Sequence, residues 1–407
     1  MLNNRIDERA PFRTLRNCSA ADVFAQLPTP SYVIDEHQLK CNGQILAEVI
    51  RKTGCHILLA QKAFSNFDFY PMLSEYVSGT EASGLYEARL GYEEMGDKEV
   101  HVFCGAYRKE EFDELLKYAD HIVFNSIHQL EKFGKTAKQA GKSIGLRINP
   151  ECSTQEGHEI YDPCSPGSRL GVTLDVWKEE MTEELLSLLD GLHFHTLCEQ
   201  NSDALKTTLK AVSAKFGSVL KQMKWINMGG GHHITRDDYD LDTLIECIEY
   251  AEKEWDVEVY LEPGEAVALN AGYLVSRVLD IIKNGNMQIA ILDSSAACHM
   301  PDVIEMPYTP PCYNATTEKT EMNSFHYRLG GPTCLSGDVI GDYYFCEPLK
   351  EGDLLVFGDM AIYTTCKNNT FNGMPLPDIW SMKEDTELEQ LTGFGYQDFK
   401  GRLGKIK

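Results

Sequence analysis

Short apolar runs alternate with amphipathic stretches from Glu36 to about Asn270. The apolar runs are typical of strands that are buried on both faces; they cover residues 56–60, 100–104, 121–125, 143–148, 191–195, 224–228 and 257–261. Helical patterns lie between them, among them residues 109–118, 127–140, 177–189 and 204–222. About eight such repeats predict an α/β fold with a parallel, TIM-like (β/α)8 barrel. A doubly wound open sheet is the competing architecture.

A polar residue or a glycine recurs where the predicted strands end. The positions are Lys62, Asn125, Asn149, His195, Gly229 and Glu262. This regularity favours the barrel, because the chemistry of β/α barrels collects at the carboxyl ends of the strands.

The pattern of hydrophobic and polar residues changes after Asn270. Strand-like segments at residues 272–281, 288–292, 325–329, 342–345 and 354–357 are separated by turns rich in Gly, Pro and Asp. This pattern predicts a second, mostly antiparallel β domain. A strand at residues 28–35 is expected to join it, so both chain ends build this domain. The predicted domains are therefore a barrel at 36–270 and a β domain at 1–35 plus 271–407.

The chain is acidic, with 62 Asp and Glu against 38 Lys and Arg and a formal net charge of −24. This excess argues against nucleic acid as a partner, because neutralising phosphates requires clustered cations. It favours the approach of a polycationic small molecule. An equally open interpretation is that the acidic residues only keep the protein soluble.

Thirteen cysteines are scattered singly, and no C-x-x-C pair occurs. We therefore expect reduced thiols and a cytoplasmic protein rather than a disulfide framework. The amino-terminal segment is polar and lacks an apolar signal-like run. No stretch has the apolar length that spans a bilayer, so no membrane association is expected.

Lys62 stands alone in an apolar run, Cys55-His-Ile-Leu-Leu-Ala-Gln-Lys-Ala-Phe64. Burial disfavours the ammonium form of lysine, which would make Lys62 a nucleophile for an aldehyde cofactor. The alternative is a surface lysine at a strand end.

Three downstream motifs complement this lysine. Gly229, Gly230 and Gly231 let backbone amides approach a phosphate, although glycine runs also make simple turns. Glu262 is an acid that could hold a pyridine nitrogen protonated, or an acid in an exposed turn. Cys334 is either a small buried side chain or a proton donor on a loop. Together the motifs point to pyridoxal phosphate (PLP).

Histidines at 193, 195, 232 and 233, with Cys198, raise the possibility of a metal site. No H-E-x-x-H or paired-cysteine motif accompanies them, so we expect no metal. An imidazole that stacks on a cofactor ring explains His195 equally well.

As an ordered set, the motifs resemble those of the fold-type III PLP decarboxylases, the family of ornithine, arginine and diaminopimelate decarboxylases. The likeness runs from about Pro30 to the carboxyl terminus. It rests on Gln61-Lys-Ala-Phe64, Glu81-Ala-Ser-Gly-Leu-Tyr-Glu87, Arg147-Ile-Asn-Pro150, Ser168-Arg-Leu-Gly171, His193-Phe-His195, Gly229-Gly-Gly231, Glu262-Pro-Gly-Glu265, Gly331-Pro-Thr-Cys334 and Tyr363.

The resemblance implies a role for each matched residue. Lys62 would hold PLP as a Schiff base, His195 would stack on its ring, and Glu262 would pair with the ring nitrogen. The remaining implied cofactor residues are Gly229, Gly230, Gly231 and Tyr363 at the phosphate, and Arg147 and Glu87 as supports of the pocket. Cys334 would donate a proton in the active site of the partner subunit, which makes the enzyme an obligate homodimer.

Within the family, the motifs are most similar to those of the branch that acts on carboxylated polyamines. Glu265 stands where ornithine and diaminopimelate decarboxylases carry arginine, and an anion there suits a substrate ammonium. Leu335 replaces the aspartate of ornithine decarboxylases that binds the distal amine, so Glu265 and Asp302 are the predicted substrate-binding residues. Cys198 replaces a phosphate-binding serine.

Three alternatives stay open at this point. One is another amino-acid decarboxylase of the family, acting on diaminopimelate, arginine or ornithine. The second is a non-catalytic regulatory homologue, against which the retained Lys62, Glu262 and Cys334 count. The third is a racemase, whose second base cannot be identified by position.

Overall fold

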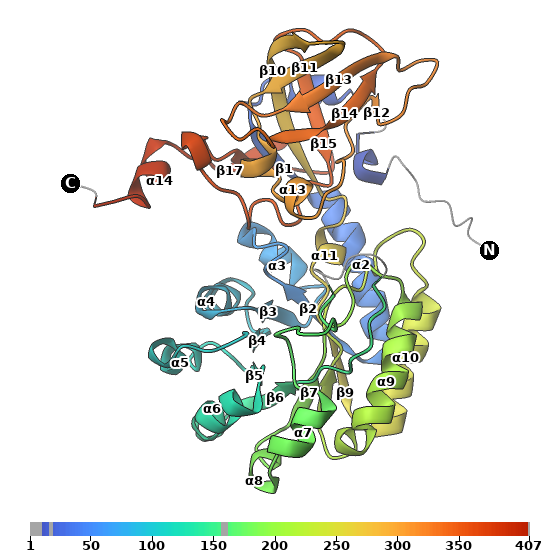
Figure 1. The fold of residues 1–407 in the computed structure, drawn as a ribbon, viewed down its shortest axis with the longest axis vertical. Helices are drawn as coiled ribbons and strands as arrows, with labels where there is room; N and C mark the ends of the chain where they lie inside the picture. Colours follow the sequence, from blue (N-terminus) through green and yellow to red (C-terminus); the bar gives the residue numbers. More distant parts are fainter. Residues whose placement is uncertain (1–9, 16–18, 156–161, 406–407) are drawn as a thin grey trace. The chain divides into compact units, whose positions relative to one another are not determined.

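The computed structural model describes residues 10–15, 19–155 and 162–405 (Figure 1). The chain divides into two compact units. The barrel unit holds Lys40–Val267, and the sheet unit combines the described residues up to Leu39 with those from Ala268 onward. Part of the predicted 1–35 segment, residues 1–9 and 16–18, lies outside the described residues.

Eight parallel strands close into a barrel in the first unit. Neighbouring strands pair in chain order, and β2 closes the ring by pairing with β9. The strands are β2 (His56–Ala60), β3 (Gly79–Ala82), β4 (Glu99–Phe103), β5 (His121–Phe124), β6 (Ser143–Arg147), β7 (Gly191–His193), β8 (Trp225–Asn227) and β9 (Glu258–Leu261). The predicted barrel is confirmed, and the open sheet is excluded.

Helices alternate with the strands along the chain of the barrel unit (Figure 1). They are α2 (Glu36–Thr53), η2 (Phe67–Phe69), α3 (Tyr70–Leu73), α4 (Leu85–Glu94), α5 (Lys109–Leu115), α6 (Ile127–Gln139), α7 (Leu174–Glu180), α8 (Glu183–Leu186), α9 (Ser202–Leu220), α10 (Leu241–Trp255) and α11 (Glu265–Ala268). Helix α6 shows why such segments form. The Ser126 hydroxyl accepts the amide of Gln129 at 3.2 Å, and apolar residues three or four apart are buried.

Two local features differ from the sequence-based expectation. The single helix predicted at 177–189 is two helices, because the Thr182 hydroxyl accepts the amide of Leu185 and begins α8. Strand β3 was not predicted, because its sequence Gly-Thr-Glu-Ala is not an apolar run.

A nine-stranded sheet forms the second unit, with the order β12-β14-β13-β11-β10-β1-β16-β17 and β15 paired to β10. Strand β1 lies antiparallel to β10 and parallel to β16, so both chain ends enter the sheet. Its strands are β1 (Ser31–Asp35), β10 (Gly272–Asn284), β11 (Met287–Leu292), β12 (Ala315–Thr316), β13 (Phe325–Gly330), β14 (Val339–Phe345), β15 (Leu354–Gly358), β16 (Asp378–Met382) and β17 (Leu388–Thr392). The predicted second sheet, mostly antiparallel and built from both ends, is confirmed.

Short helices complete the sheet unit. They are η1 (Ala10–Phe12), α1 (Ala20–Phe24), α12 (Ala296–His299), α13 (Asp302–Glu305), η4 (Phe371–Gly373) and α14 (Tyr396–Gly401).

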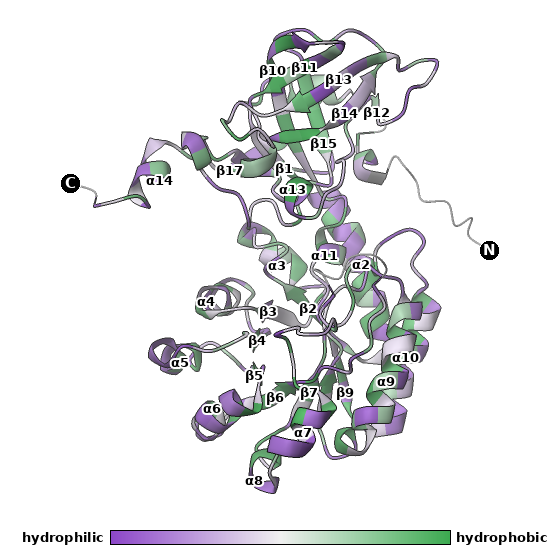
Figure 2. Ribbon diagram, viewed as in Figure 1, coloured by the Kyte–Doolittle hydropathy of each residue, from purple (hydrophilic) through white to green (hydrophobic). Residues whose placement is uncertain are grey.

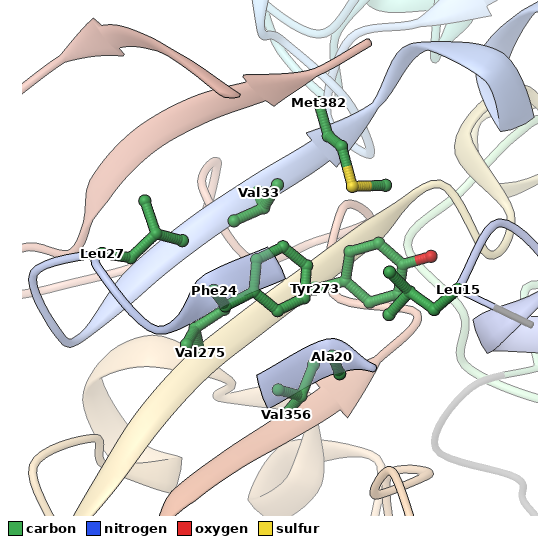
Figure 3. Close-up of a cluster of buried hydrophobic side chains, with 9 residues drawn as sticks. All are labelled: Leu15, Ala20, Phe24, Leu27, Val33, Tyr273, Val275, Val356 and Met382. Atoms are coloured by element: carbon green, nitrogen blue, oxygen red, sulfur yellow. The ribbon is translucent and has the colours of Figure 1, made fainter. Parts of the chain in front are cut away.

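One hydrophobic cluster joins the distant segments of the sheet unit (Figure 3). Phe24 of α1, Tyr273 of β10 and Met382 of β16 are each fully buried in it or nearly so. Figure 2 shows hydrophobic residues along β10 and β15, the strands on which this cluster packs. Burying these side chains fixes the amino-terminal segment to the carboxyl-terminal strands.

No helix among the described residues combines the length and the apolarity needed to cross a bilayer.

Candidate active site

The carboxyl ends of the barrel strands carry most of the predicted site residues. Arg147 ends β6, His195 lies two residues after β7, and Glu262 directly follows β9. Lys62 lies two residues after β2. In a parallel barrel these ends share one face, so tertiary structure brings the four side chains to one site.

Glu262 is a buried anion held by two partners. Its carboxylate accepts Nδ2 of Asn227 at 2.6 Å and Nε2 of His193 at 3.1 Å, and the residue is 5% exposed. Burial raises the pKa of Glu262, but the charge and hydrogen bond of His193, with Lys62 and His101, outweigh it and leave the pKa below its ordinary value. The carboxylate is therefore ionised at neutral pH.

Glu81 of β3 is a second buried carboxyl group at this site, 2% exposed. Its Oε2 atom has no hydrogen-bond partner among the residues that the structure describes. Burial first, and the charge of Glu262 second, raise the pKa of Glu81 to about 8, although Lys62 and Arg147 oppose the rise. Two carboxyl groups in different protonation states are thus combined, a pattern common in acid–base sites.

Arg147 is a buried cation between an aromatic ring and a carbonyl group. Its Nη2 atom donates to the carbonyl oxygen of His195 at 3.1 Å, and the guanidinium carbon lies 4.6 Å from the ring centre of Phe103. Burial lowers the pKa of Arg147 to about 10 against the attraction of Glu262, so the residue stays charged at neutral pH. Arg147 therefore offsets the charge of the buried carboxylate.

His195 presents a neutral ring at the same end of the barrel. Its Nδ1 atom accepts the amide of Gly230 at 3.1 Å, which leaves the ring proton on Nε2. Burial, then the charges of Lys62 and Arg147, hold the pKa of His195 well below its usual range.

The three glycines are required by close backbone approach. Gly229 and Gly231 have φ of 71° and 78°, and a Cβ atom on Gly231 would lie 2.1 Å from the carbonyl oxygen of Leu197. The amide of Gly229 donates to Oδ1 of Asn227 at 2.9 Å, and that of Gly230 donates to the ring of His195. Two of the three amides thus already have acceptors within the barrel.

Lys62 occupies a turn that packs against the Glu262 loop. The strand ends at Ala60, and Lys62 is partly exposed rather than buried as the apolar run predicts. A Cβ atom on Gly264 would lie 2.6 Å from Cβ of Ala63, so Pro263-Gly264 packs directly on this turn. A lysine at the rim keeps access to solvent, which lowers the cost of its charge.

Two further predicted residues have local partners in the barrel unit. Glu87 of α4 accepts the amide of Ser83 at 2.6 Å, which stabilises the start of its helix. Glu265 lies 3.8 Å from Nε2 of His233, whose pKa is lowered to about 4 by burial and by Arg236. Glu265 therefore lies beside an imidazole that is neutral at neutral pH.

The other predicted residues belong to the sheet unit. Cys334 is exposed on the loop after β13, and Tyr363 adopts a φ of 51° after β15. Asp302 of α13 forms an ion pair with Lys367, which also pairs with Glu305. The structure thus gives Asp302 a cationic partner from its own chain.

The imidazoles considered for a metal have separate partners. His193 binds Glu262, His195 binds Gly230, and Nε2 of His232 lies 3.3 Å from the carbonyl oxygen of Met228. A different group, Glu99, His101 and His121, has ligand atoms within 4.8 Å of one another. It lies toward the amino ends of the strands, and its two rings stack at 3.9 Å and 13°. Stacked rings do not direct their lone pairs at one point.

Comparison with known proteins places this site in a family. Residues 31–361 match the family described as pyridoxal-dependent decarboxylase, C-terminal sheet domain. The carboxynorspermidine/carboxyspermidine decarboxylase of Campylobacter jejuni is 43% identical over 389 residues, which cover 93% of this chain and 99% of that protein. The carboxyaminopropylagmatine decarboxylase of Synechocystis is 40% identical, covering 94% of this chain and 97% of that protein.

Solved structures agree with this relationship. The carboxynorspermidine decarboxylase of Campylobacter jejuni, complexed with norspermidine, superimposes with a TM-score of 0.84 at 42% identity, covering 92% of this chain and 100% of that one. The diaminopimelate decarboxylase of Methanocaldococcus jannaschii, at 19% identity and a TM-score of 0.79, shares the fold.

The barrel, the second sheet and the buried charges together define an enzyme that uses pyridoxal phosphate. The chain belongs to the pyridoxal-dependent decarboxylase family. It is a decarboxylase, and PLP is its cofactor.

The residues of this chain fit that cofactor. A lysine amine can hold the aldehyde, an ionised carboxylate can pair with the pyridine nitrogen, and a neutral imidazole provides a flat face. Oε2 of Glu81 and Nδ1 of His193 are buried polar atoms without a hydrogen-bond partner in the described part of the chain, and buried polar atoms normally have one.

Sequence reasoning missed Glu81 and Asn227 as site residues. Only the family resemblance of the motif that begins at Glu81 pointed to this residue, because β3 is not an apolar run that would identify it as a strand. Asn227 immediately precedes Met228 and the glycines, so its position at the end of a predicted strand was the available signal.

Proposed function

We propose that this enzyme decarboxylates carboxynorspermidine to norspermidine and carboxyspermidine to spermidine, as a step of polyamine biosynthesis. The observation that carries the proposal is the 43% identity, over nearly the full length of both chains, to the Campylobacter jejuni enzyme with that name. A second relative with the same name, from Herminiimonas arsenicoxydans, is 34% identical over 93% of this chain.

The charge of the chain supports a polyamine substrate. Glu265 is an acid with a neutral neighbour, His233, and the chain carries a net charge of −24. Both features favour a substrate with several ammonium groups. We propose Glu265 and Asp302 as residues that bind those groups, with Asp302 exchanging Lys367 for a substrate ammonium.

The proposed residue roles follow from the site. Bound PLP supplies an electron sink for the electron pair that loss of CO₂ leaves on the α-carbon. Glu262 would hold a proton at the pyridine nitrogen, because a buried carboxylate stabilises a neighbouring proton. Lys62 would hold the cofactor aldehyde through its amine in the absence of substrate, and Arg147 and the ring of His195 would orient the cofactor.

The remaining roles rest on the family resemblance. Gly229, Gly230, Gly231 and Tyr363 are proposed to bind the phosphate, and Glu87 to support the pocket. Of the three glycine amides, that of Gly231 makes no hydrogen bond within the described residues. Phosphate binding by all three therefore requires the amides of Gly229 and Gly230 to leave their present acceptors.

Cys334 is proposed to protonate the α-carbon in the site of a second subunit. Its exposure on a loop suits a residue that acts across a homodimer. The described cysteines are all free thiols, which supports a reducing compartment, and we propose the cytoplasm.

A second substrate also has specific support. The Synechocystis relative, at 40% identity, is named for carboxyaminopropylagmatine. Relatives named for diaminopimelate are 22–26% identical, so diaminopimelate has weaker support than either polyamine.

A substrate panel tests the proposal. Purified enzyme with PLP is given carboxynorspermidine, carboxyspermidine, carboxyaminopropylagmatine, diaminopimelate, ornithine and arginine, and CO₂ release is measured for each. We expect the first two to give the highest kcat/KM, within about 10–200-fold of each other, since one methylene group separates them. A higher kcat/KM for any other substrate overturns the assignment, and no CO₂ from any of them supports a regulatory homologue.

A further inference from the structure

Cys334 lies on an exposed loop whose conformation is set by a buried side chain. The loop joins β13 to β14 and reads Gly331-Pro-Thr-Cys-Leu-Ser-Gly-Asp338. Cys334 is exposed, whereas Asp338 at the end of the loop is only 4% exposed. The reactive group and the residue that anchors its loop are therefore separated by four positions.

The carboxylate of Asp338 accepts hydrogen bonds from three residues. The Ser295 hydroxyl lies 2.9 Å from both oxygens, the Ala297 amide lies 3.2 Å from Oδ1, and the Thr333 hydroxyl lies 2.6 Å from Oδ2. These donors are all neutral groups. Three donors on one buried carboxyl group restrict its position, so they constrain the segments that carry them.

Thr333 and Leu335 connect this carboxylate to both sides of the cysteine. The Thr333 hydroxyl, besides donating to Asp338, accepts the amide of Leu335 at 3.4 Å. The carbonyl oxygen of Leu335 accepts the amide of Asp338 at 2.9 Å. The residues immediately before and after Cys334 are therefore both tied to Asp338.

The base of the loop is closed by the same residue. The amide of Gly331 donates to the carbonyl oxygen of Asp338 at 3.0 Å. A Cβ atom on Gly331 would lie 2.2 Å from Oδ2, so glycine is required for the carboxylate to sit there. The close approach fixes the distance between the two ends of the loop.

Helix α12 anchors the carboxylate to the interior of the sheet unit. Ser295 is fully buried and caps α12 by accepting the amide of Cys298 at 3.2 Å. A second contact holds the loop itself, since the amide of Cys334 donates to Oδ1 of Asn372 at 2.8 Å. The position of Cys334 thus depends on Asn372, which it contacts, and on buried groups that it does not contact.

We propose that Asp338 is the positioning residue of Cys334: it holds the 331–338 loop in the conformation that presents the thiol for proton donation. This inference rests on the proposed role of Cys334. Asp338 contacts neither cofactor nor substrate in this scheme and acts only through the loop.

A double-mutant cycle separates positioning from general stability. In the Cys334-containing enzyme, Asp338→Ala is expected to lower kcat about tenfold with KM changed less than about threefold. In a Cys334→Ala background the same change is expected to lower kcat by less than about twofold, because the residue it positions is gone. An equal loss in both backgrounds overturns the proposal.

Two further variants distinguish loss of positioning from misfolding. Thr333→Val removes one hydroxyl bond to the carboxylate and is expected to give a smaller loss of the same kind. Asp353→Asn changes an acid of the same unit whose carboxylate accepts the local amide of Lys350 at 2.9 Å, and it is expected to leave kcat unchanged. A loss in Asp353→Asn as large as that in Thr333→Val contradicts the specific role.

Hydrogen exchange tests the loop independently of activity. Mass spectrometry is expected to show at least about threefold faster exchange for the 331–339 peptide in Thr333→Val and Asp338→Ala, with the 378–392 peptide unchanged. Unchanged exchange at 331–339 overturns the positioning role even if the enzyme has no measurable turnover. Faster exchange together with normal turnover leaves the loop assignment standing and shows that the proposed role of Cys334 is wrong.

Discussion

Glu81 and Glu262 are two buried carboxyl groups at the same end of the barrel that hold opposite protonation states at neutral pH. Their strands, β3 and β9, both pair with β2, the strand that leads to Lys62. Asn227 and His193 stabilise the charge of Glu262, whereas Glu81 is left with an unpartnered oxygen. Burial raises the pKa of Glu81 most and the charge of Glu262 raises it further, so only Glu262 is ionised.

Glu81→Gln is expected to stabilise the protein most at alkaline pH. The folded pKa of Glu81, about 8, lies above that of an unfolded glutamate, so wild-type stability falls as the pH rises from about 4.5 to 8. Glutamine cannot ionise and removes this dependence. Melting temperatures of the two proteins at pH 5.5 and 8.5 test this. We expect the free energy of unfolding gained by Glu81→Gln to be larger at pH 8.5 than at pH 5.5 by more than about 1 kcal/mol. If the gain is the same at both pH values, the raised pKa of Glu81 is excluded.

Glu262→Gln is expected to lower kcat by about 100-fold or more, because a neutral amide does not hold a proton on the pyridine nitrogen. Asn227→Ala removes only one hydrogen bond to the carboxylate and is expected to cost about tenfold. PLP absorbance of both purified variants controls for cofactor loss. Wild-type turnover in Glu262→Gln, with PLP bound, would remove this residue from the mechanism.

Lys62 is expected to carry the cofactor covalently. Borohydride reduction of the holoenzyme, followed by peptide mapping, is expected to place the pyridoxyl group on the peptide that contains Lys62. Lys62→Ala should lose the label and at least about 1000-fold in kcat, while Lys52→Ala, an exposed lysine of α2, should keep both. A label on any other lysine of the wild-type protein contradicts the assignment.

Gly231→Ala is expected to destabilise the protein by about 2–4 kcal/mol, since the new methyl group meets the carbonyl of Leu197 and the backbone has positive φ. Gly96 has a similar φ of 73° but open space around it. Gly96→Ala should therefore cost only the backbone strain, about 1–2 kcal/mol. Urea denaturation of both variants gives the comparison, and equal losses would show that the close approach is unimportant.

Glu265→Gln is expected to raise KM for carboxynorspermidine about tenfold with kcat nearly unchanged, because it removes the anion that we propose binds a substrate ammonium. Asp302→Asn should act in the same direction but more weakly, since Lys367 already neutralises part of that charge. Steady-state kinetics at low ionic strength measures both. An unchanged KM in Glu265→Gln moves distal recognition to other residues.

The barrel was predictable because most of its strands are apolar throughout and are separated by amphipathic helices. Strand β3 escaped this signal. Its residues Thr80 and Glu81 are buried but polar, so they resemble a loop when hydrophobicity is the only guide. Strand β3 carries Glu81, one of the two site residues that were missed, and the strand and this residue both escaped prediction for the same reason. Strands β16 and β17 were also missed, and their register depends on pairing with β1 from the other chain end.

The sequence by itself determined the alternation of strands and helices, the placement of polar residues at strand ends, and the motif order that resembles one family. These are local properties, since period and composition act over a few residues. Only the tertiary structure decided which carboxyl group is charged, that Lys62 lies at the rim, and that Asp338 sets the loop of Cys334. Each of these depends on burial and on partners distant in sequence, and the electrostatic cost of a charge is set by the groups that fold around it.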